Sequence, residues 1–519
     1  MKKFLLAFLL LICLDAIPSA AAGRKNPKLL VAVVIDQFRY DYLTRFEPEY
    51  KAGFARLLQN GAVFTDAHYL HFLTVTAVGH STFLSGATPS ISGIIGNEWY
   101  DRNAKQQVTS VSDEGVKLVG GITGRTGSSP HRLLVDTIPD ELKMEQKGGK
   151  TISVSIKDRS AILPAGHMAD AAYWYDNDSN TWVTSSYYVK ELPGWVKDIN
   201  NSRPISKYLG MQWLPLDAKP GQKPLCSLVS GTDVRYCGSI EATPWGNEMI
   251  ESFAERAIAA EQLGHHDGTD VLAVSFSSND YVGHAVGPDS PEVRDISIRT
   301  DRLLGQLLDY VDAQVGPGNS ILVLTADHGV APVPEINQER KMPGGRVSDL
   351  EQALTSALTK RFGPGKWVSG GSATAPYLNL ELIQSKKLEQ AEVERVGAEA
   401  LRSVSHVFRV YTRDQLMLGQ VQQDPVSRAV SYGFNGQRSP DLLVILDPYY
   451  LADNPPGTSH GTPFGYDTHV PVIFMGPGIK PGRYDERIAP NDIAPTLAAL
   501  LKIEEPAGSI GRILSEIFE

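Results

Sequence analysis

Positive charge is scarce in this sequence of 519 residues. It holds 49 lysines and arginines against 59 aspartates and glutamates, which gives a formal net charge of −10. An acidic chain is a poor general ligand for nucleic acid, so we exclude that class of partner. Any anionic substrate must therefore be held by local positive charge, from metal ions or from a few lysines and arginines.

Long apolar runs are also scarce. The first residues read MKKFLLAFLLLICLDAIPSAAAG, and their apolar run is too short to span a bilayer. Two lysines before the run and small residues after it are typical of a secretory signal peptide, which we assign to residues 1–22. Since no later run is long enough to span a membrane, we expect no stable membrane association. The mature protein, residues 23–519, is expected to be secreted and periplasmic in a Gram-negative source.

Cysteine is rarer still, with three in the chain. Cys13 lies in the predicted signal peptide, which leaves Cys226 and Cys237, eleven positions apart. In an oxidising compartment this pair is expected to form a disulfide that closes a small loop. A reactive thiol is the alternative.

What the chain does have is a series of buried-type strands separated by helices. Apolar, β-branched runs at 29–35, 150–156, 270–276 and 320–324 are typical of parallel strands buried on both faces. Helices are expected at 40–60, 245–263, 291–315 and 491–501. The pattern predicts an α/β fold, a three-layer sandwich with a mainly parallel central sheet and helices on both faces. We expect one catalytic domain with two insertions, a cap at about 102–244 and an α+β segment at about 331–438.

Metal-binding residue types follow the predicted strands. They are Asp36, Asp280 with His284, and Asp327 with His328, while His469 precedes a later strand. Open α/β sheets place their sites at the carboxyl ends of strands, so these six groups are expected to converge. Histidine nitrogen and carboxylate oxygen are zinc ligands, and catalytic zinc takes about three from the protein. The count predicts two zinc ions, although any one residue, such as Asp36 in a solvated turn, could be merely structural.

A hydroxyl and a potential anion clamp accompany these groups. Thr76 stands at the start of a predicted helix, where it is either the helix N-cap or a nucleophile. Asn97 could donate hydrogen bonds to the group that is attacked. Lys157 and Arg159 follow a predicted strand, and two cations at this spacing can point the same way and hold one anion. The alternative for them is an exposed ion pair with Asp158.

Seven short motifs together resemble the alkaline phosphatase superfamily, and above all its secreted bacterial alkaline phosphatases with a threonine nucleophile, relatives of the nucleotide pyrophosphatase/phosphodiesterases. The motifs are Val34-Ile35-Asp36, Thr74-Val75-Thr76 with Gly79-His80, Gly96-Asn97, Lys157-Asp158-Arg159, Asp280-Tyr281-Val282-Gly283-His284, Ala326-Asp327-His328-Gly329 and Asp467-Thr468-His469-Val470-Pro471. The resemblance covers nearly the whole mature chain.

The resemblance implies a role for each candidate residue. One zinc is expected on Asp280, His284 and His469, and the other on Asp36, Asp327, His328 and the Thr76 hydroxyl oxygen. Thr76 is expected to attack phosphorus and form a phosphothreonine, with Asn97, Lys157 and Arg159 on the phosphoryl oxygens. His80 is expected to be packed or behind the site, and His460 and Asp467 could orient ligands.

The resulting prediction is a monomeric, zinc-dependent alkaline phosphatase that acts on small-molecule phosphate monoesters. Two cations beside Asn97 favour the dianion of a monoester over the monoanion of a diester. The first alternative is a phosphodiesterase or nucleotide pyrophosphatase on the same scaffold. The second is a secreted metal- or phosphate-binding protein without turnover. A sulfatase is disfavoured, because the chain from Thr76 reads Thr-Ala-Val-Gly-His and lacks the C/S-x-P-x-R motif.

Overall fold

A large mixed sheet forms the centre of the computed structural model, which describes residues 26–231, 233–452 and 456–519. The predicted signal peptide lies outside the described residues. The sheet has eleven strands in the order β21-β2-β20-β13-β1-β12-β7-β8-β9-β5-β6. Its middle is parallel and consists of β13 (Ser320–Thr325), β1 (Leu29–Ile35), β12 (Thr269–Phe276), β7 (Gly148–Ser155) and β8 (Ala171–Asp176).

Antiparallel pairings extend the sheet on both sides of this parallel centre. On one side β20 pairs with β13 and β2, and on the other β9 pairs with β8 and β5. These outer strands are β20 (Val472–Met475), β2 (Ala62–Phe64), β21 (Gly482–Tyr484), β9 (Thr181–Ser185), β5 (Ser112–Val119) and β6 (Thr126–Ser128).

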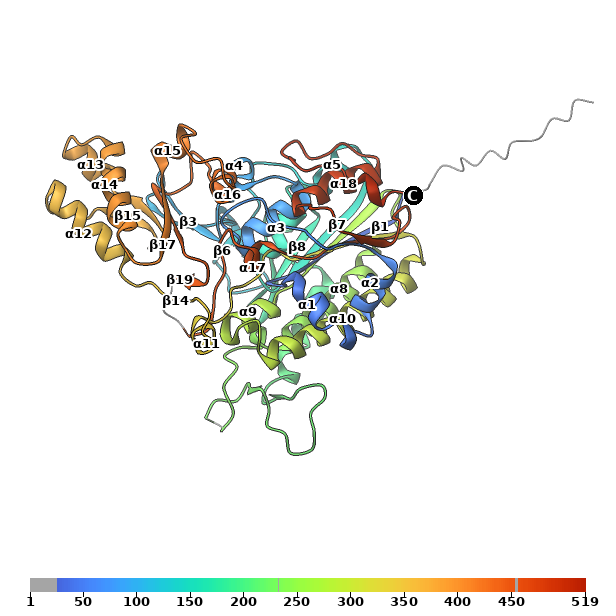
Figure 1. The fold of residues 1–519 in the computed structure, drawn as a ribbon. Coiled ribbons are helices and arrows are strands. Elements are labelled where there is room, and N and C mark those ends of the chain that lie inside the picture. Colours follow the sequence, from blue (N-terminus) through green and yellow to red (C-terminus); the bar gives the residue numbers. More distant parts are fainter. Residues whose placement is uncertain (1–25, 232, 453–455) are drawn as a thin grey trace, which may run out of the picture.

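Helices cover both faces of the sheet, as predicted (Figure 1). Alternate residues of β1 face opposite sides: Leu29, Val31, Val33 and Ile35 pack into one core, and Leu30, Ala32 and Val34 into another. The first core includes α1 (Tyr40–Arg45), α2 (Gly53–Asn60), α8 (Pro244–Glu261) and α10 (Pro291–Val315). The second includes α3 (Thr76–Ser85), α5 (Ile138–Met144) and α18 (Ile493–Leu501), and α6 (Asp158–Ala165) packs beside α3. The three-layer α/β prediction is confirmed.

The segment predicted as a cap at 102–244 is not set apart from the main fold. Its strands β5 to β9 belong to the central sheet, in which β7 pairs with β12 on one side and with β8 on the other. A loop drawn in green projects from the body (Figure 1). It follows α7 (Gly194–Asn201) in the chain and contains β10 (Gln212–Trp213) and β11 (Cys226–Ser227). The predicted disulfide is present in this loop, where Cys226 and Cys237 are bonded with their Cα atoms 5.4 Å apart.

The second predicted insertion forms a separate lobe, drawn in yellow and orange in Figure 1. It has its own core under α12 (Leu350–Phe362) and α14 (Gln390–Arg402). The lobe runs past the predicted end at 438, because β18 (Leu442–Leu446) pairs with β17 (Val407–Thr412). Its other elements are α11 (Pro334–Glu339), β14 (Gly345–Arg346), β15 (Val368–Ser372), β16 (Ala375–Leu378), α13 (Leu380–Ser385), α15 (Arg413–Met417), α16 (Pro425–Gly433) and β19 (Tyr450–Leu451).

Short elements connect these layers. They are α4 (Pro89–Ser92), β3 (Glu98–Asp101), β4 (Gln106–Thr109), α9 (Ser278–Val286) and α17 (Gly465–Thr468). Among the described residues, no helix combines the length and the apolar character needed to cross a membrane.

Candidate active site

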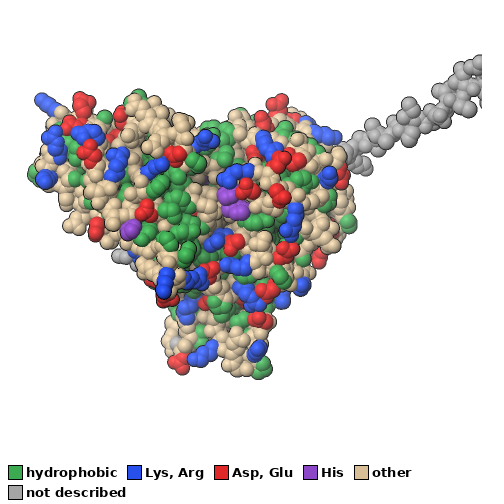
Figure 2. Space-filling view, viewed as in Figure 1, with side chains coloured by type: hydrophobic (Ala, Val, Ile, Leu, Met, Phe, Trp, Pro, Cys, Tyr) green, Lys and Arg blue, Asp and Glu red, His purple; other side chains and the backbone are tan. Residues whose placement is uncertain are grey.

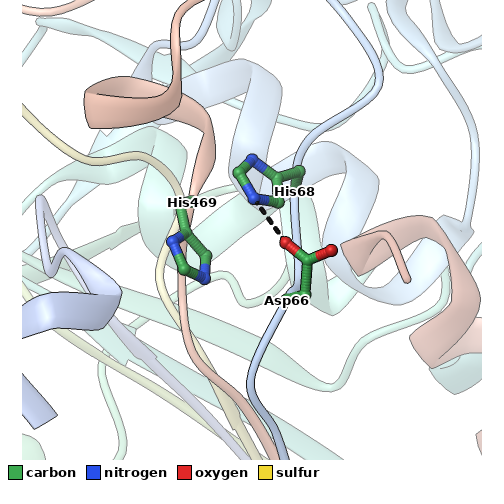
Figure 3. Close-up of side chains that lie close together, drawn as sticks. All are labelled: Asp66, His68 and His469. Atoms are coloured by element: carbon green, nitrogen blue, oxygen red, sulfur yellow. Dashed lines mark ion pairs between the residues drawn. The ribbon is translucent and has the colours of Figure 1, made fainter. Parts of the chain in front are cut away.

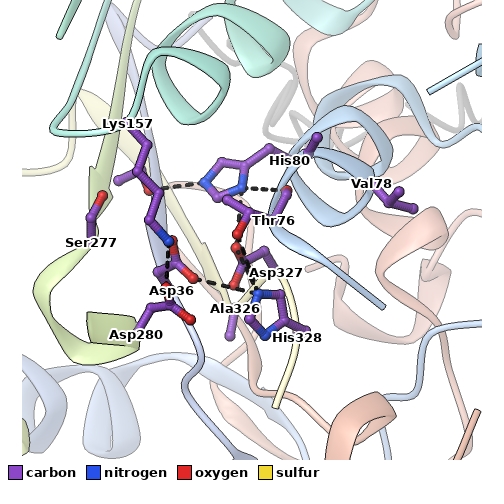
Figure 4. A network of polar contacts seen from close by, with 12 residues as sticks. Asp36, Thr76, Val78, His80, Lys157, Ser277, Asp280, Ala326, Asp327 and His328 are labelled. Atoms are coloured by element: carbon purple, nitrogen blue, oxygen red, sulfur yellow. Dashed lines mark hydrogen bonds and ion pairs between the residues drawn. The ribbon is translucent and has the colours of Figure 1, made fainter. Parts of the chain in front are cut away.

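The carboxyl ends of three parallel strands bring the predicted metal-binding residues together. Strands β1, β12 and β13 lie side by side in register, so the residues that follow them meet at one edge of the sheet. Asp36 directly follows β1, Asp280 and His284 lie on α9 after β12, and Asp327 and His328 follow β13. Figure 4 shows Asp36, Asp280, Asp327 and His328 around Thr76 and Lys157.

Asp36, Asp327 and His328 form a first donor set, whose ligand atoms lie within 4.8 Å of one another. His328 Nε2 is 3.5 Å from Asp36 Oδ1 and 3.5 Å from Asp327 Oδ2. Both of these buried carboxylate oxygens accept no hydrogen bond from any described residue. Burial, followed by the neighbouring Asp327 charge, raises the pKa of Asp36 well above its usual value. Paired buried carboxylates with free oxygens fit a divalent cation.

Asp280, His284 and His460 form the second donor set. His284 Nε2 lies 3.2 Å and His460 Nε2 3.7 Å from Asp280 Oδ1. Because Asp280 and His284 are four residues apart on α9, they project from the same helix face. The sequence prediction placed this stretch after the strand without recognising that it is helical.

All three histidines in the two sets are oriented for ligation through Nε2. Nδ1 of His284 is 2.8 Å from the Thr458 carbonyl oxygen, and the corresponding Nδ1 contacts of His460 with Thr74 and of His328 with Gly329 are 2.8 and 2.9 Å. Donation of Nδ1–H to a carbonyl leaves the lone pair on Nε2, the arrangement usual for metal-binding histidine. Burial also lowers the pKa of His328 and of His460, which favours their neutral, ligating form.

His469 is not brought to Asp280 and His284, contrary to the sequence prediction. It lies with Asp66 and His68, as Figure 3 shows, and its Nε2 donates to the Thr65 carbonyl oxygen at 2.9 Å. Its ring stacks on His68 at 4.4 Å. His460 takes the expected place instead. The two histidines are nine positions apart in one connection, and motif order alone does not show which of them turns inward.

Thr76 is the first residue of α3, and its hydroxyl faces the first donor set. Thr76 Oγ1 lies 3.5 Å from His328 Nε2. The N-cap residue is Val75, and the Ala77 N–H donates to Asn97 Oδ1 at 2.8 Å. The alternative in which Thr76 caps the helix is therefore wrong. Asn97 closes the helix end and keeps its Nδ2 protons free of any hydrogen bond to the described residues.

Lys157 joins the two donor sets. Its Nζ donates to Asp36 Oδ2 and to Asp280 Oδ2, both at 2.6 Å. Burial alone would lower the pKa of Lys157, but the Asp280 and Asp36 charges raise it above the usual lysine value. An ammonium group carries three protons, so one remains for a further acceptor. The alternative of an exposed ion pair with Asp158 does not apply to Lys157, which is 5% exposed. Arg159 does lie near Asp158, with Nη1 3.9 Å from Asp158 Oδ1.

His80 lies behind the site, as expected. Its Nδ1 is 2.8 Å from the Thr76 carbonyl oxygen and 3.3 Å from Asp327 Oδ2, and its Nε2 is 2.8 Å from Ser275 Oγ. It therefore ties the start of α3 to the loop after β13 and to β12.

A pocket of about 650 Å³ opens between the body and the lobe at this site. Asn97, Arg159, His284 and His460 contribute its polar wall, and Arg159 Nε has no hydrogen-bond partner among the described residues. Apolar side chains, among them Phe72, Leu73 and Trp99, line another part, and Thr374 and Tyr377 come from the lobe. Figure 2 shows a band of hydrophobic side chains along the boundary between lobe and body. The pocket can hold an anion at the donor sets and an organic group beside it.

Comparison with known proteins places this site in a family. The model of the family described as type I phosphodiesterase / nucleotide pyrophosphatase matches residues 30–468. Alkaline phosphatase PafA of Elizabethkingia meningoseptica is 36% identical over 99% of each chain, and a crystal structure of PafA superposes with a TM-score of 0.89, at 34% identity over 96% of this chain and all of that chain.

Two further relatives match over nearly their whole length. Alkaline phosphatase PhoV of Synechococcus elongatus is 37% identical over 95% of this chain and 93% of its own. A protein of Myroides odoratus named calcium-transporting ATPase is 37% identical over 96% of each chain. The chain belongs to the type I phosphodiesterase/nucleotide pyrophosphatase family.

Proposed function

We propose that the protein is a secreted, monomeric alkaline phosphatase that hydrolyses phosphate monoesters with Thr76 as nucleophile and two zinc ions as cofactors. One observation carries the proposal: the Thr76 hydroxyl stands beside two adjacent three-residue donor sets that a buried lysine links. The names of PafA and PhoV, relatives over almost their entire length, point to the same reaction.

The donor chemistry supports zinc. One set would be Asp36, Asp327 and His328 together with Thr76 Oγ1, and the other Asp280, His284 and His460. Each combines imidazole nitrogen with carboxylate oxygen, and three protein ligands leave a coordination position open. When bound, such cations lower the pKa of a neighbouring hydroxyl and neutralise charge on phosphoryl oxygens.

Each side chain of this site then has a distinct role in phosphoryl transfer. Thr76 loses its hydroxyl proton and its Oγ1 forms a bond to phosphorus, while the bond from phosphorus to the ester oxygen breaks and that oxygen leaves as the protonated alcohol. Water then attacks phosphorus of the phosphothreonine, which releases inorganic phosphate and restores the Thr76 hydroxyl. Asn97 Nδ2, the third proton of Lys157 and the Arg159 guanidinium would donate to the phosphoryl oxygens. The pocket beside Arg159 would hold the leaving group.

The charge of the site favours monoesters over diesters. The terminal phosphate of a monoester is a dianion, so two nearby cations attract it more strongly than they attract the monoanion of a diester. The diester also carries a second substituent, for which the site must provide space. Lys157 and Arg159 supply these cations within a protein of net charge −10.

An activity panel tests this proposal. Purified protein is assayed on nitrophenyl phosphate, the matching diester, a sulfate ester and ATP, before and after EDTA and again after zinc is added back. We expect the highest kcat/KM on the monoester, loss of activity with EDTA and its return with zinc. A preference for the diester would overturn the monoesterase assignment, and a zinc-loaded protein without turnover of any ester would favour a binding protein.

A further inference from the structure

Gln37 contacts both donor sets, although its residue type suggested no role in the sequence. It directly follows Asp36 and is 2% exposed. Its backbone N–H donates to Asp327 Oδ1 at 3.1 Å, and its side-chain Nε2 donates to Asp280 Oδ1 at 2.6 Å. A single residue thus holds one carboxylate of each set.

These contacts require an unfavourable backbone. Gln37 has a φ of 60°, in the left-handed region that residues with a Cβ adopt at a cost of about 1 kcal/mol or more. Its Oε1 is buried with no hydrogen-bond partner among the described residues, which is a second cost. Glycine at this position would avoid both, so the carboxamide must have a use that offsets them.

The neighbouring helix is shaped around this side chain. A Cβ on Gly283 of α9 would lie 1.8 Å from Gln37 Oε1. Gly283 lies between Asp280 and His284 on α9, so the glycine that leaves room for the carboxamide separates two members of the second donor set in the sequence.

We propose that Gln37 is a positioning residue that fixes the rotation of the Asp280 carboxylate and holds the second donor set at its distance from the first. Oδ1 of Asp280 receives the Gln37 proton and faces His284 Nε2, while Oδ2 receives the proton of Lys157. With both oxygens held, the Asp280 carboxylate is oriented before a cation arrives. This inference rests on the proposed two-zinc site.

Two substitutions distinguish the effect of the Gln37 carboxamide from the effect of its left-handed backbone. Gln37→Gly removes the side chain and relaxes the left-handed strain, whereas Gln37→Met keeps an unbranched chain and the strain but removes the donor. Gln146 provides a matched control, because it is exposed, has a φ of 57° and lies outside both donor sets. Gln146→Gly therefore reports the backbone effect alone.

The readouts are zinc affinity by competition with a chromophoric chelator, zinc content by elemental analysis, and the Tm of the metal-free protein. We expect both Gln37 variants to lose about 10- to 100-fold in affinity for one of the two zinc ions. The metal-free Tm of Gln37→Gly should equal or exceed that of the wild type, as for Gln146→Gly. Wild-type affinity for both ions in both Gln37 variants would overturn the inference. If the wild type itself binds fewer than two zinc ions, the proposed function fails first and this inference falls with it.

Discussion

At the scale of single residues, Lys157 and Arg159 have different surroundings and hence different tasks. Lys157 is buried between Asp36 and Asp280, so its positive charge partly neutralises one carboxylate of each donor set. Arg159 lines the pocket, and its Nε has no hydrogen-bond partner among the described residues. Its guanidinium Nη1 lies 3.9 Å from Asp158 Oδ1, which also accepts from the Arg159 backbone N–H at 2.7 Å. A substitution of Arg159 is therefore the better test of how activity depends on the charge of the substrate.

Arg159→Ala should discriminate between the two ester classes. Hydrogen bonds to charged groups contribute about 1.5–3 kcal/mol, so we expect kcat/KM on the monoester to fall roughly 10- to 100-fold. The loss on the matching diester should be smaller, because that substrate carries less charge. Steady-state kinetics on both nitrophenyl esters measures this, and equal losses would contradict an anion clamp for the monoester.

Asp467 should make stability depend on pH. It is fully buried, its Oδ1 has no hydrogen-bond partner among the described residues, and burial raises its pKa from 3.8 to about 7. A raised pKa in the folded state gives stability that is present below pH 3.8 and is lost as pH rises through about 7. Each pKa unit corresponds to about 1.4 kcal/mol, so the loss is on the order of a few kcal/mol.

Asp467→Asn removes this titration while keeping an oxygen to accept from Thr462. The Tm of the variant relative to the wild type should therefore rise between pH 4 and pH 8, measured by calorimetry in EDTA. A Tm difference that is constant over this range would show that Asp467 does not titrate there.

The residue types of the site could be predicted from the sequence, but one of their positions could not. Asp36, Asp327 and His328 follow apolar strands, a signal that a single sequence carries. His460 and His469 both lie outside strands in one connection, and only the folded path shows that His460 stacks on His328 at 3.6 Å. Gln37 gives no signal, because its contacts depend on a left-handed backbone.

At the scale of elements, long apolar patterns were predicted well and interrupted ones were not. The strand at 29–35 and the helix at 291–315 have the predicted bounds. The predicted helix at 40–60 is broken into α1, a short turn containing Pro48, and α2. Lys51 and Ala52 N–H groups in the break donate to Asp301 of α10, a tertiary contact that periodicity does not reveal.

Gly79 of α3 packs directly against the backbone of Asp327 in the loop after β13. A Cβ there would lie 2.2 Å from the Asp327 carbonyl oxygen and 2.6 Å from the Asp327 Cα. Because backbone cannot move aside as a side chain can, Gly79→Ala should push α3, and Thr76 with it, away from the first donor set.

We expect Gly79→Ala to lower kcat/KM by about 100-fold, since small misplacements of reacting groups have effects of this size. Its Tm should also fall. Gly194→Ala in α7 is the control, because no atom of the described residues lies within 4 Å of a Cβ there. An active Gly79→Ala protein with unchanged Tm would mean that α3 and the Asp327 loop are not held as closely as the structure has them.

At the scale of the whole molecule, the order of strands in the sheet was beyond sequence reasoning. The apolar run at 150–156 predicts a strand, but it does not show that this strand lies at the centre of the sheet rather than in a cap. Its partner β12 is more than a hundred residues away, and pairing over such distances leaves no local pattern. The lobe has amphipathic helices of its own, which pack into a separate core and give a local signal in the sequence.

The projecting loop with Cys226 and Cys237 should matter for stability and not for catalysis. None of its described residues belongs to a donor set or lines the pocket. A bond that closes a loop of this length contributes about 2–3 kcal/mol on the chain-entropy account. The Cys226→Ser, Cys237→Ser double variant should therefore lose several degrees in Tm and keep wild-type kcat/KM, and a large fall in kcat/KM would place the loop in the active site.

The most direct test of the central claim combines turnover and zinc content in Thr76→Ala. Removal of the nucleophile should abolish phosphate release from nitrophenyl phosphate. Elemental analysis should still find two zinc ions per chain, because Asp36, Asp327 and His328 remain as ligands of the first set and the second set is untouched. A Thr76→Ala protein that hydrolyses the monoester at the wild-type rate would contradict the account.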